Sequence, residues 1–115
     1  MSLSSRFRAR TPRSAELRYV PKAYVIVDMD VTDPEKYEGY RALAAPAVEA
    51  GGGRYLARGG SCEILEGDRI PKRIVILEFP DMDAARAWYD SPQYVEARAA
   101  RDGAATGSFI AVEGV

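Results

Sequence analysis

The segment from Ala23 to Asp30 is rich in apolar and β-branched residues with a period of two, which predicts the first β-strand of the chain. Alternate side chains then point to opposite faces of a sheet. One face carries Ala23, Val25, Val27 and Met29, and the other carries Tyr24, Ile26, Asp28 and Asp30. Both faces therefore contain apolar residues, which is unusual for a strand with one side in water.

A helix is predicted next, because Asp33 is a good N-cap, Pro34 suits the first helical position and Glu35 suits the positive end of the helix dipole. Apolar residues recur with a helical period at Tyr37, Tyr40, Ala44, Ala47 and Val48. Pro46 lies late in this pattern, so we expect it to kink or break the last turn. The three glycines at 51–53 end the helix.

Two further strands are predicted in the middle of the chain. The first runs from Arg54 to Gly60, and residues 62–65 are expected to extend it after a bend at the glycine pair. Residues 66–68 form a turn. The next strand, Arg73 to Phe79, is apolar on both faces and ends at Pro80.

Two short helices and a last strand complete the pattern. Asp81 caps a helix that reaches Tyr89, and a Ser-Pro pair at 91–92 starts another that reaches about Arg101. Residues 103–107 are expected to form a loop, followed by a strand from Phe109 to Glu113. The order β-α-β-β-α-β predicts an α+β, ferredoxin-like domain, with a four-stranded antiparallel sheet and its helices on one face.

The opposite face of this sheet is expected to need a second subunit. Two apolar faces need two covers, and the helices supply only one. We predict a homodimeric α/β barrel whose buried sheet face carries Tyr24, Ile26, Ile74, Ile76 and Phe109. Charged residues are expected on the same faces, with Asp28, Glu78 and Glu113 in phase with apolar neighbours and Arg58 in phase with Leu56. They form either a structural ion-pair set or a polar pocket.

Charge is unevenly distributed over the 115 residues. Residues 1–21 form a basic N-terminal extension with a net charge of +4, and the domain predicted over 22–115 carries −5. The extension is interpreted as a flexible start, a partner-binding arm or a weak targeting segment. An acidic domain is a poor match for nucleic acid, so none is expected as a partner.

Composition excludes several kinds of chemistry and location. The chain has no histidine and one cysteine, Cys62, which removes histidine-based nucleophilic triads, histidine metal sites and an internal disulfide. We expect no cofactor and no metal, since carboxylates at 28, 30 and 33 are interpreted as a loop coincidence. No apolar run is long enough to cross a membrane and no signal peptide is evident, so we expect a cytoplasmic protein without a membrane partner.

Several segments together resemble a small bacterial family known as domain of unknown function 1330. They are KAYVI at 22–26, VTDPEKY at 31–37, GGRYLARGG at 52–60, LEG at 65–67, RIVILEFP at 73–80, WYDSPQY at 88–94 and VEG at 112–114. The resemblance covers residues 21–115 and implies a dimeric α/β barrel. It implies membership of a broad superfamily that also holds cofactor-free monooxygenases, muconolactone-type isomerases, haem peroxidases and ligand-sensing domains. It implies no activity.

Two groups of residues are candidates for a ligand site. Arg58, followed by two glycines, suits a clamp for a carboxylate or phosphate, or else a β-bulge with a structural ion pair. Aromatic residues on the helices suit either core packing or a cleft for a flat ligand, with Arg98 available for an anionic group. The full candidate set is Asp28, Tyr40, Arg58, Trp88, Tyr89, Tyr94 and Arg98.

Two functions of different classes follow from these candidates. The first is a dimer that binds or transforms a small aromatic or carboxylated metabolite without a cofactor, with tyrosine hydroxyls and Asp28 as the available proton-transfer groups. The second is a non-catalytic dimerisation or interaction module in which the charges are structural. A cavity of a few hundred Å³ that reaches Arg58 would favour the first.

Overall fold

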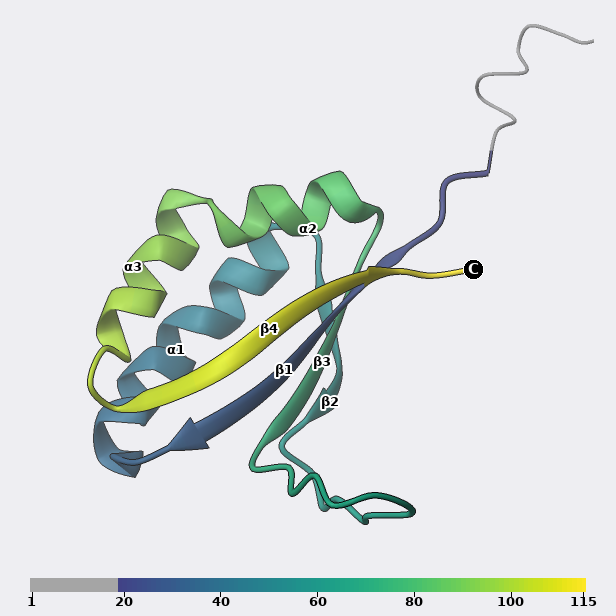
Figure 1. Cartoon of the computed structure of the whole chain (residues 1–115). Helices are drawn as coiled ribbons and strands as arrows, with labels where there is room; N and C mark the ends of the chain where they lie inside the picture. Colours follow the sequence, from purple (N-terminus) through teal and green to yellow (C-terminus); the bar gives the residue numbers. More distant parts are fainter. Residues whose placement is uncertain (1–18) are drawn as a thin grey trace, which may run out of the picture.

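A computed structural model describes residues 19–115 and contains a four-stranded antiparallel sheet with three helices on one face (Figure 1). The elements are β1 (Ala23–Val31), α1 (Pro34–Ala50), β2 (Arg54–Arg58), β3 (Ile74–Phe79), α2 (Met82–Tyr89), α3 (Pro92–Ala100) and β4 (Ala105–Glu113). The strand order is β2-β3-β1-β4, so the two crossovers place β1 and β3 at the centre. The predicted α+β, ferredoxin-like architecture is confirmed.

The helix boundaries follow the capping signals. The side chains of Asp33, Asp81 and Ser91 each accept a hydrogen bond from the backbone N–H three residues later. The expected break at Pro46 is wrong, because α1 runs unbroken to Ala50. Pro46 and Ala42 lie on the exposed side of the helix, where water can satisfy the carbonyl that the proline leaves without a donor.

The strand boundaries differ from the prediction at both edges of the sheet. β2 ends at Arg58, and residues 59–73 form an exposed connection with no further strand. β4 begins at Ala105, inside the predicted loop, and pairs with β1 along its whole length. Gly107 allows this pairing, since a Cβ there would lie 2.6 Å from the backbone oxygen of Asp28.

The register assigns each strand residue to one of two faces. Val25 and Val27 of β1 lie opposite Leu77 and Val75 of β3, and all four are buried beneath the helices. The other face, here called the open face, shows Ile26 paired with Ile76 on one side and Ile110 on the other. In the single chain, Ile26 is 37% exposed and Ile110 is 58% exposed.

Three predicted facings on the outer strands are wrong. Phe109 pairs with Val27 and packs on the helix-covered core, so the open face carries Ile110 and Val112 in its place. Glu113 pairs with Ala23 and therefore also falls on the helix side. A bulge between Tyr55 and Ala57 shifts the phase of β2, which turns Arg58 to the helix side opposite Val75.

Residues 1–18 lie outside the part of the chain that the structure describes, so the basic extension over 1–21 stays a prediction. In the described part, no helix is long and apolar enough to cross a membrane. Within residues 19–115, the side chains of His, Cys, Asp and Glu form no group of three that could hold a metal ion.

Candidate functional site

Aromatic side chains from all three helices form one cluster above the sheet. Trp88 lies between Phe79 and Tyr94, with ring centroids 5.1 and 4.3 Å away. Tyr89 and Phe109 extend the cluster toward β4, their rings 5.9 Å apart. Helical spacing places Trp88 and Tyr94 on the buried faces of α2 and α3, and Phe79 and Phe109 meet them from the sheet.

Tyr40 and Tyr94 form a buried hydroxyl pair inside this cluster. Their oxygens are 2.7 Å apart, which joins α1 to α3 by a hydrogen bond. Burial raises the pKa of both phenols, and their mutual contact raises that of Tyr40 further. Both therefore stay protonated at neutral pH, and one hydroxyl donates the shared hydrogen bond to the other, so neither is a base.

A narrow cavity lies between this hydroxyl pair and the sheet. Its volume is about 30 Å³, enough for a single water molecule. Three arginines line it, Arg41, Arg58 and Arg73. Outside the cavity, an open groove of about 310 Å³ runs between α1 and β2. Arg58, Tyr55 and Val48 line both spaces, so they separate the cavity from the groove.

The three arginines have few anionic partners. The guanidinium of Arg58 lies 4.2 Å from the ring centroid of Tyr55, and that of Arg73 donates a hydrogen bond of 3.3 Å to the Tyr37 hydroxyl. Arg41 pairs with Glu38 at 3.0 Å. Within residues 19–115, neither Arg58 nor Arg73 forms an ion pair. Two of the three positive charges, those of Arg58 and Arg73, thus lie beside aromatic rings, and the nearby carboxylates are Glu38, which pairs with Arg41, and Glu49 in the groove wall.

Arg98 lies on the other side of the aromatic cluster from Arg58. Its guanidinium stacks 4.2 Å from the Tyr89 ring centroid and donates to the Tyr89 hydroxyl at 3.3 Å. Arg98 does not line the cavity that Arg58 lines, so these two candidates do not belong to the same site. The groove that Tyr89 lines, between α2 and β4, holds about 310 Å³ and is largely apolar.

Asp28 does not join the other candidates, because it points to the open face. Its carboxylate accepts hydrogen bonds of 3.0 Å from the Lys72 backbone N–H and from Arg69. These contacts, the backbone bond first, hold its pKa below the ordinary 3.8. A charged, fully partnered carboxylate on the far side of the sheet is not placed to move protons at the cavity.

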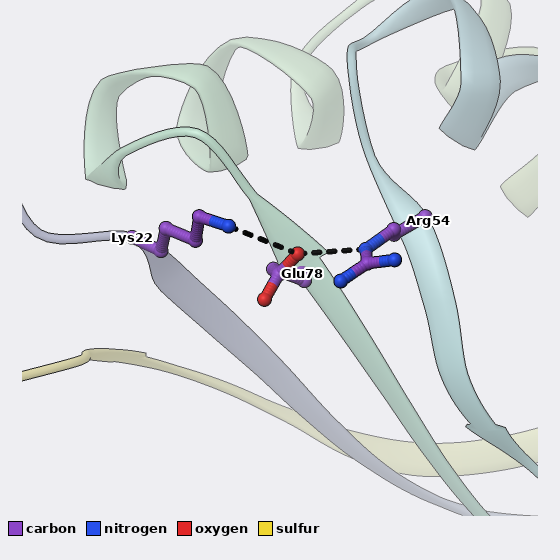
Figure 2. Close-up of polar contacts among 3 residues, drawn as sticks. All are labelled: Lys22, Arg54 and Glu78. Atoms are coloured by element: carbon purple, nitrogen blue, oxygen red, sulfur yellow. Dashed lines mark hydrogen bonds and ion pairs between the residues drawn. The ribbon is translucent and has the colours of Figure 1, made fainter.

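Glu78 occupies the other end of the open face in a similar arrangement. It lies 2.7 Å from Arg54 and 3.7 Å from Lys22, as Figure 2 shows. The hydrogen bond from Arg54 is the main reason that the pKa of Glu78 is lowered. Two ion-pair groups therefore bracket the apolar residues of the open face, which favours a structural role for these charges.

Acid is expected to weaken the fold through these two carboxylates. Because their pKa values are lower when folded, their contribution is present above the unfolded values near 4 and is lost as the pH falls through the folded values. The urea midpoint should drop between about pH 7 and about pH 3. The drop should be smaller in Glu78→Gln, and an equal drop in that variant would contradict the assignment.

Sequence reasoning missed Arg41, Arg73 and Tyr55, which complete the cavity around Arg58. Arg41 was detectable in principle, since it follows Tyr37 by four residues on the same helix. Arg73 required the pairing of β2 with β3, which brings its side chain beside Gly59. Tyr55 required the bulge, because only a phase shift puts it on one face with Arg58.

The family described as a domain of unknown function (DUF1330) matches residues 22–115. The chain belongs to this family. No curated protein matches the sequence. Among solved structures, a protein of unknown function from Rhodopseudomonas palustris is 21% identical, with a TM-score of 0.68 over 93% of this chain and 95% of that one.

Two other solved structures share the fold at lower similarity. A dimeric ferredoxin-like protein of unknown function from Thermobifida fusca is 20% identical over 84% of this chain and 92% of that one, with a TM-score of 0.57. SnoaB, a cofactor-independent oxygenase from Streptomyces nogalater, is 15% identical over 84% of this chain and 95% of that one, also at 0.57. At these identities the likeness shows the ferredoxin-like fold of the DUF1330 chain and leaves its chemistry open.

Proposed function

We propose that this DUF1330 protein is a homodimer that binds a small aromatic carboxylate beside Arg58, without a resident cofactor. The observation that carries the proposal is the convergence of Arg41, Arg58 and Arg73 on one aromatic-walled space. Neither Arg58 nor Arg73 forms an ion pair within residues 19–115, and a ligand carboxylate beside Arg58 supplies an anionic partner. Arginine also suits a carboxylate geometrically, because its planar fork donates two parallel hydrogen bonds.

The size of the surrounding space supports a small ring as the rest of the ligand. The inner cavity admits little more than one water, but the groove outside it, at about 310 Å³, reaches the lower end of the range for ligand pockets. Tyr55 lies in the groove wall next to Arg58. A ligand whose carboxylate meets Arg58 therefore has an aromatic surface beside it for its ring.

Any transformation of such a ligand would rely on hydrogen-bond donation by the buried tyrosines. The chain has no histidine, and Asp28 lies on the other side of the sheet. The cofactor-independent oxygenase from Streptomyces nogalater has a similar fold, which is compatible with chemistry at this layer. Binding is the part of the proposal that the geometry supports directly, and transformation of the ligand is secondary to it.

The homodimer is supported by the composition of the open face. Three of its apolar side chains are well exposed in one chain, namely Ile26 at 37%, Val112 at 45% and Ile110 at 58%. A contiguous apolar surface on a sheet of this kind needs a cover. The ferredoxin-like protein from Thermobifida fusca is described as dimeric. A second copy of this chain is the cover that we propose.

A second candidate function is a dimerisation module without a ligand. One observation favours it: Asp28 and Glu78 are both partnered within their own chain and lie only 14% and 12% exposed. Charges arranged in this way fix the register of an interface and need no ligand. The two functions differ in what they predict for Arg58.

Benzoate and its hydroxylated derivatives are expected to raise the thermal midpoint of the wild-type protein. A ligand present at about 100 times its Kd stabilises the folded state by about 2.7 kcal/mol. Arg58→Gln should weaken binding at least about tenfold, which corresponds to about 1.4 kcal/mol, because the charged hydrogen bonds to the carboxylate are lost. Thermal-shift titrations with each compound provide the measurement.

Arg86→Gln is the matched control for this experiment. Arg86 is an exposed arginine on α2 that pairs with Asp83 at 3.0 Å and does not line the groove beside Arg58. Its variant should bind the aromatic carboxylates like the wild type. No shift with any of these compounds, or an equal shift in both variants, would favour the dimerisation module.

A further inference from the structure

The connection between β2 and β3, residues 59–73, exposes three large apolar side chains. Ile64 is 50% exposed, Leu65 is 90% exposed and Ile70 is 70% exposed. Two antiparallel strands need only a two-residue turn, so the length of this connection has to be explained by something other than chain reversal. Figure 1 shows that it projects beyond the end of the sheet, away from the three helices.

The base of this connection is fixed to the open face. The Asp28 carboxylate accepts hydrogen bonds from Arg69 and from the Lys72 backbone N–H, both at 3.0 Å. At the other end, the Gly59 N–H donates to the Ile74 carbonyl at 2.8 Å. Asp28 lies in line with Ile26 on β1, so the projecting segment continues the open face past the sheet.

We infer that residues 59–73 form a clasp that packs the apolar side chains of Ile64, Leu65 and Ile70 on the second copy of this chain. The inference rests on the proposed homodimer. A segment that projects past its own sheet cannot bury these side chains on its own subunit, and water is an unfavourable surrounding for them. Because the clasp continues the open face, a partner seated on that face is the surface within its reach.

Two-fold symmetry makes this arrangement self-consistent. In an isologous dimer both subunits use the same surface patch, so both clasps engage at once and every contact occurs twice.

The clasp also begins directly after Arg58 and ends at Arg73. The Arg73 side chain lies against Gly59, where a Cβ would come within 2.9 Å of its Nε atom. A partner that holds the clasp therefore also holds the two arginines of the proposed ligand site.

Leu65→Asp tests the clasp. The side chain is almost fully exposed in one chain, so the substitution is expected to leave the fold and its circular dichroism unchanged. In the dimer it removes a buried leucine and places a carboxylate in an apolar contact, twice over. The dimer dissociation constant of the full chain, from sedimentation equilibrium, should rise at least about tenfold. Leu65→Ser should raise it less.

Val95→Asp is the matched control, since Val95 is 46% exposed on α3, in the helical layer on the opposite face from Asp28 and Ile26. Its dissociation constant should equal that of the wild type. If the wild type is dimeric and Leu65→Asp has the same dissociation constant, the clasp is overturned but the dimer is not. The same conclusion follows if Val95→Asp raises the dissociation constant as much as Leu65→Asp does. A wild type that is monomeric at tens of micromolar overturns both.

Discussion

Replacing Ile26 with aspartate is expected to leave a folded subunit that no longer dimerises. Ile26 lies on the central strand β1, between Ile76 of β3 and Ile110 of β4, in the middle of the open face. In the dimer its side chain would be covered, and an aspartate there would bury a carboxylate between two isoleucines, with the Asp28 carboxylate two residues away on the same face.

The size of this effect follows from the symmetry of the interface. Burying an unpaired polar group costs about 1–3 kcal/mol in proteins, and a charge costs more. Each dimer contains the substitution twice, so the loss is at least about 4 kcal/mol, or about a 1,000-fold rise in the dissociation constant. Sedimentation equilibrium over a wide concentration range measures this change directly.

Leu43→Asp provides a control of equal exposure. Leu43 on α1 is 38% exposed and Ile26 is 37% exposed, so the two sites lose similar contacts within the single chain. Only the helical site lies on the side away from the open face. A subunit with Ile26→Asp that sediments with the mass of the wild-type dimer would show that the open face is not the interface.

Alternation predicted the central strands correctly but could not orient the outer ones. In β1 the two sets of alternating side chains were assigned as observed, because the strand is regular and its side chains keep a period of two along its whole length. A period of two divides a strand into two faces but does not say which face meets the helices. For β4 that choice depends on the register of Phe109 with Val27, a contact between residues far apart in sequence.

Backbone exceptions explain the remaining errors. Gly107 reads as a loop residue, yet it is needed inside β4 because a Cβ would collide with the Asp28 backbone oxygen. The bulge before Ala57 reverses the facing of Arg58, whereas the glycine pair that suggested a bulge in the sequence lies after Arg58. The arginines of the candidate site come from α1, β2 and the connection that precedes β3, so their convergence required the tertiary structure. The aromatic cluster was easier to predict, since it lies largely on helical faces.

Removing the Trp88 side chain is expected to cause the largest loss of stability in the subunit. The residue is 2% exposed, and its ring contacts those of Phe79, Tyr89 and Tyr94. It also lines both the narrow cavity beneath α1 and the groove between α2 and β4. Without the indole the cavity and the groove join into one larger space. We expect the neighbouring side chains to fill that space only in part, so most of the lost contacts are not replaced. Trp88→Ala should cost about 3–5 kcal/mol.

A loss of that size is a large fraction of the 5–15 kcal/mol that stabilises a typical domain. The urea midpoint, followed by far-ultraviolet circular dichroism at one protein concentration, should fall accordingly, since dimerisation makes the midpoint concentration-dependent. Trp88→Phe separates packing from hydrogen bonding. The buried indole N–H has no partner within residues 19–115, so phenylalanine sacrifices volume but no hydrogen bond.

We therefore expect Trp88→Phe to cost about 1–2 kcal/mol, well below the alanine variant, because most of the ring contacts survive. If the phenylalanine variant were as unstable as the alanine variant, the indole N–H would have to bind an acceptor, such as a water held in the narrow cavity. If neither variant moved the midpoint, Trp88 would not be the centre of the core. The contrast between the two substitutions thus measures how far aromatic packing alone holds the helices on the sheet.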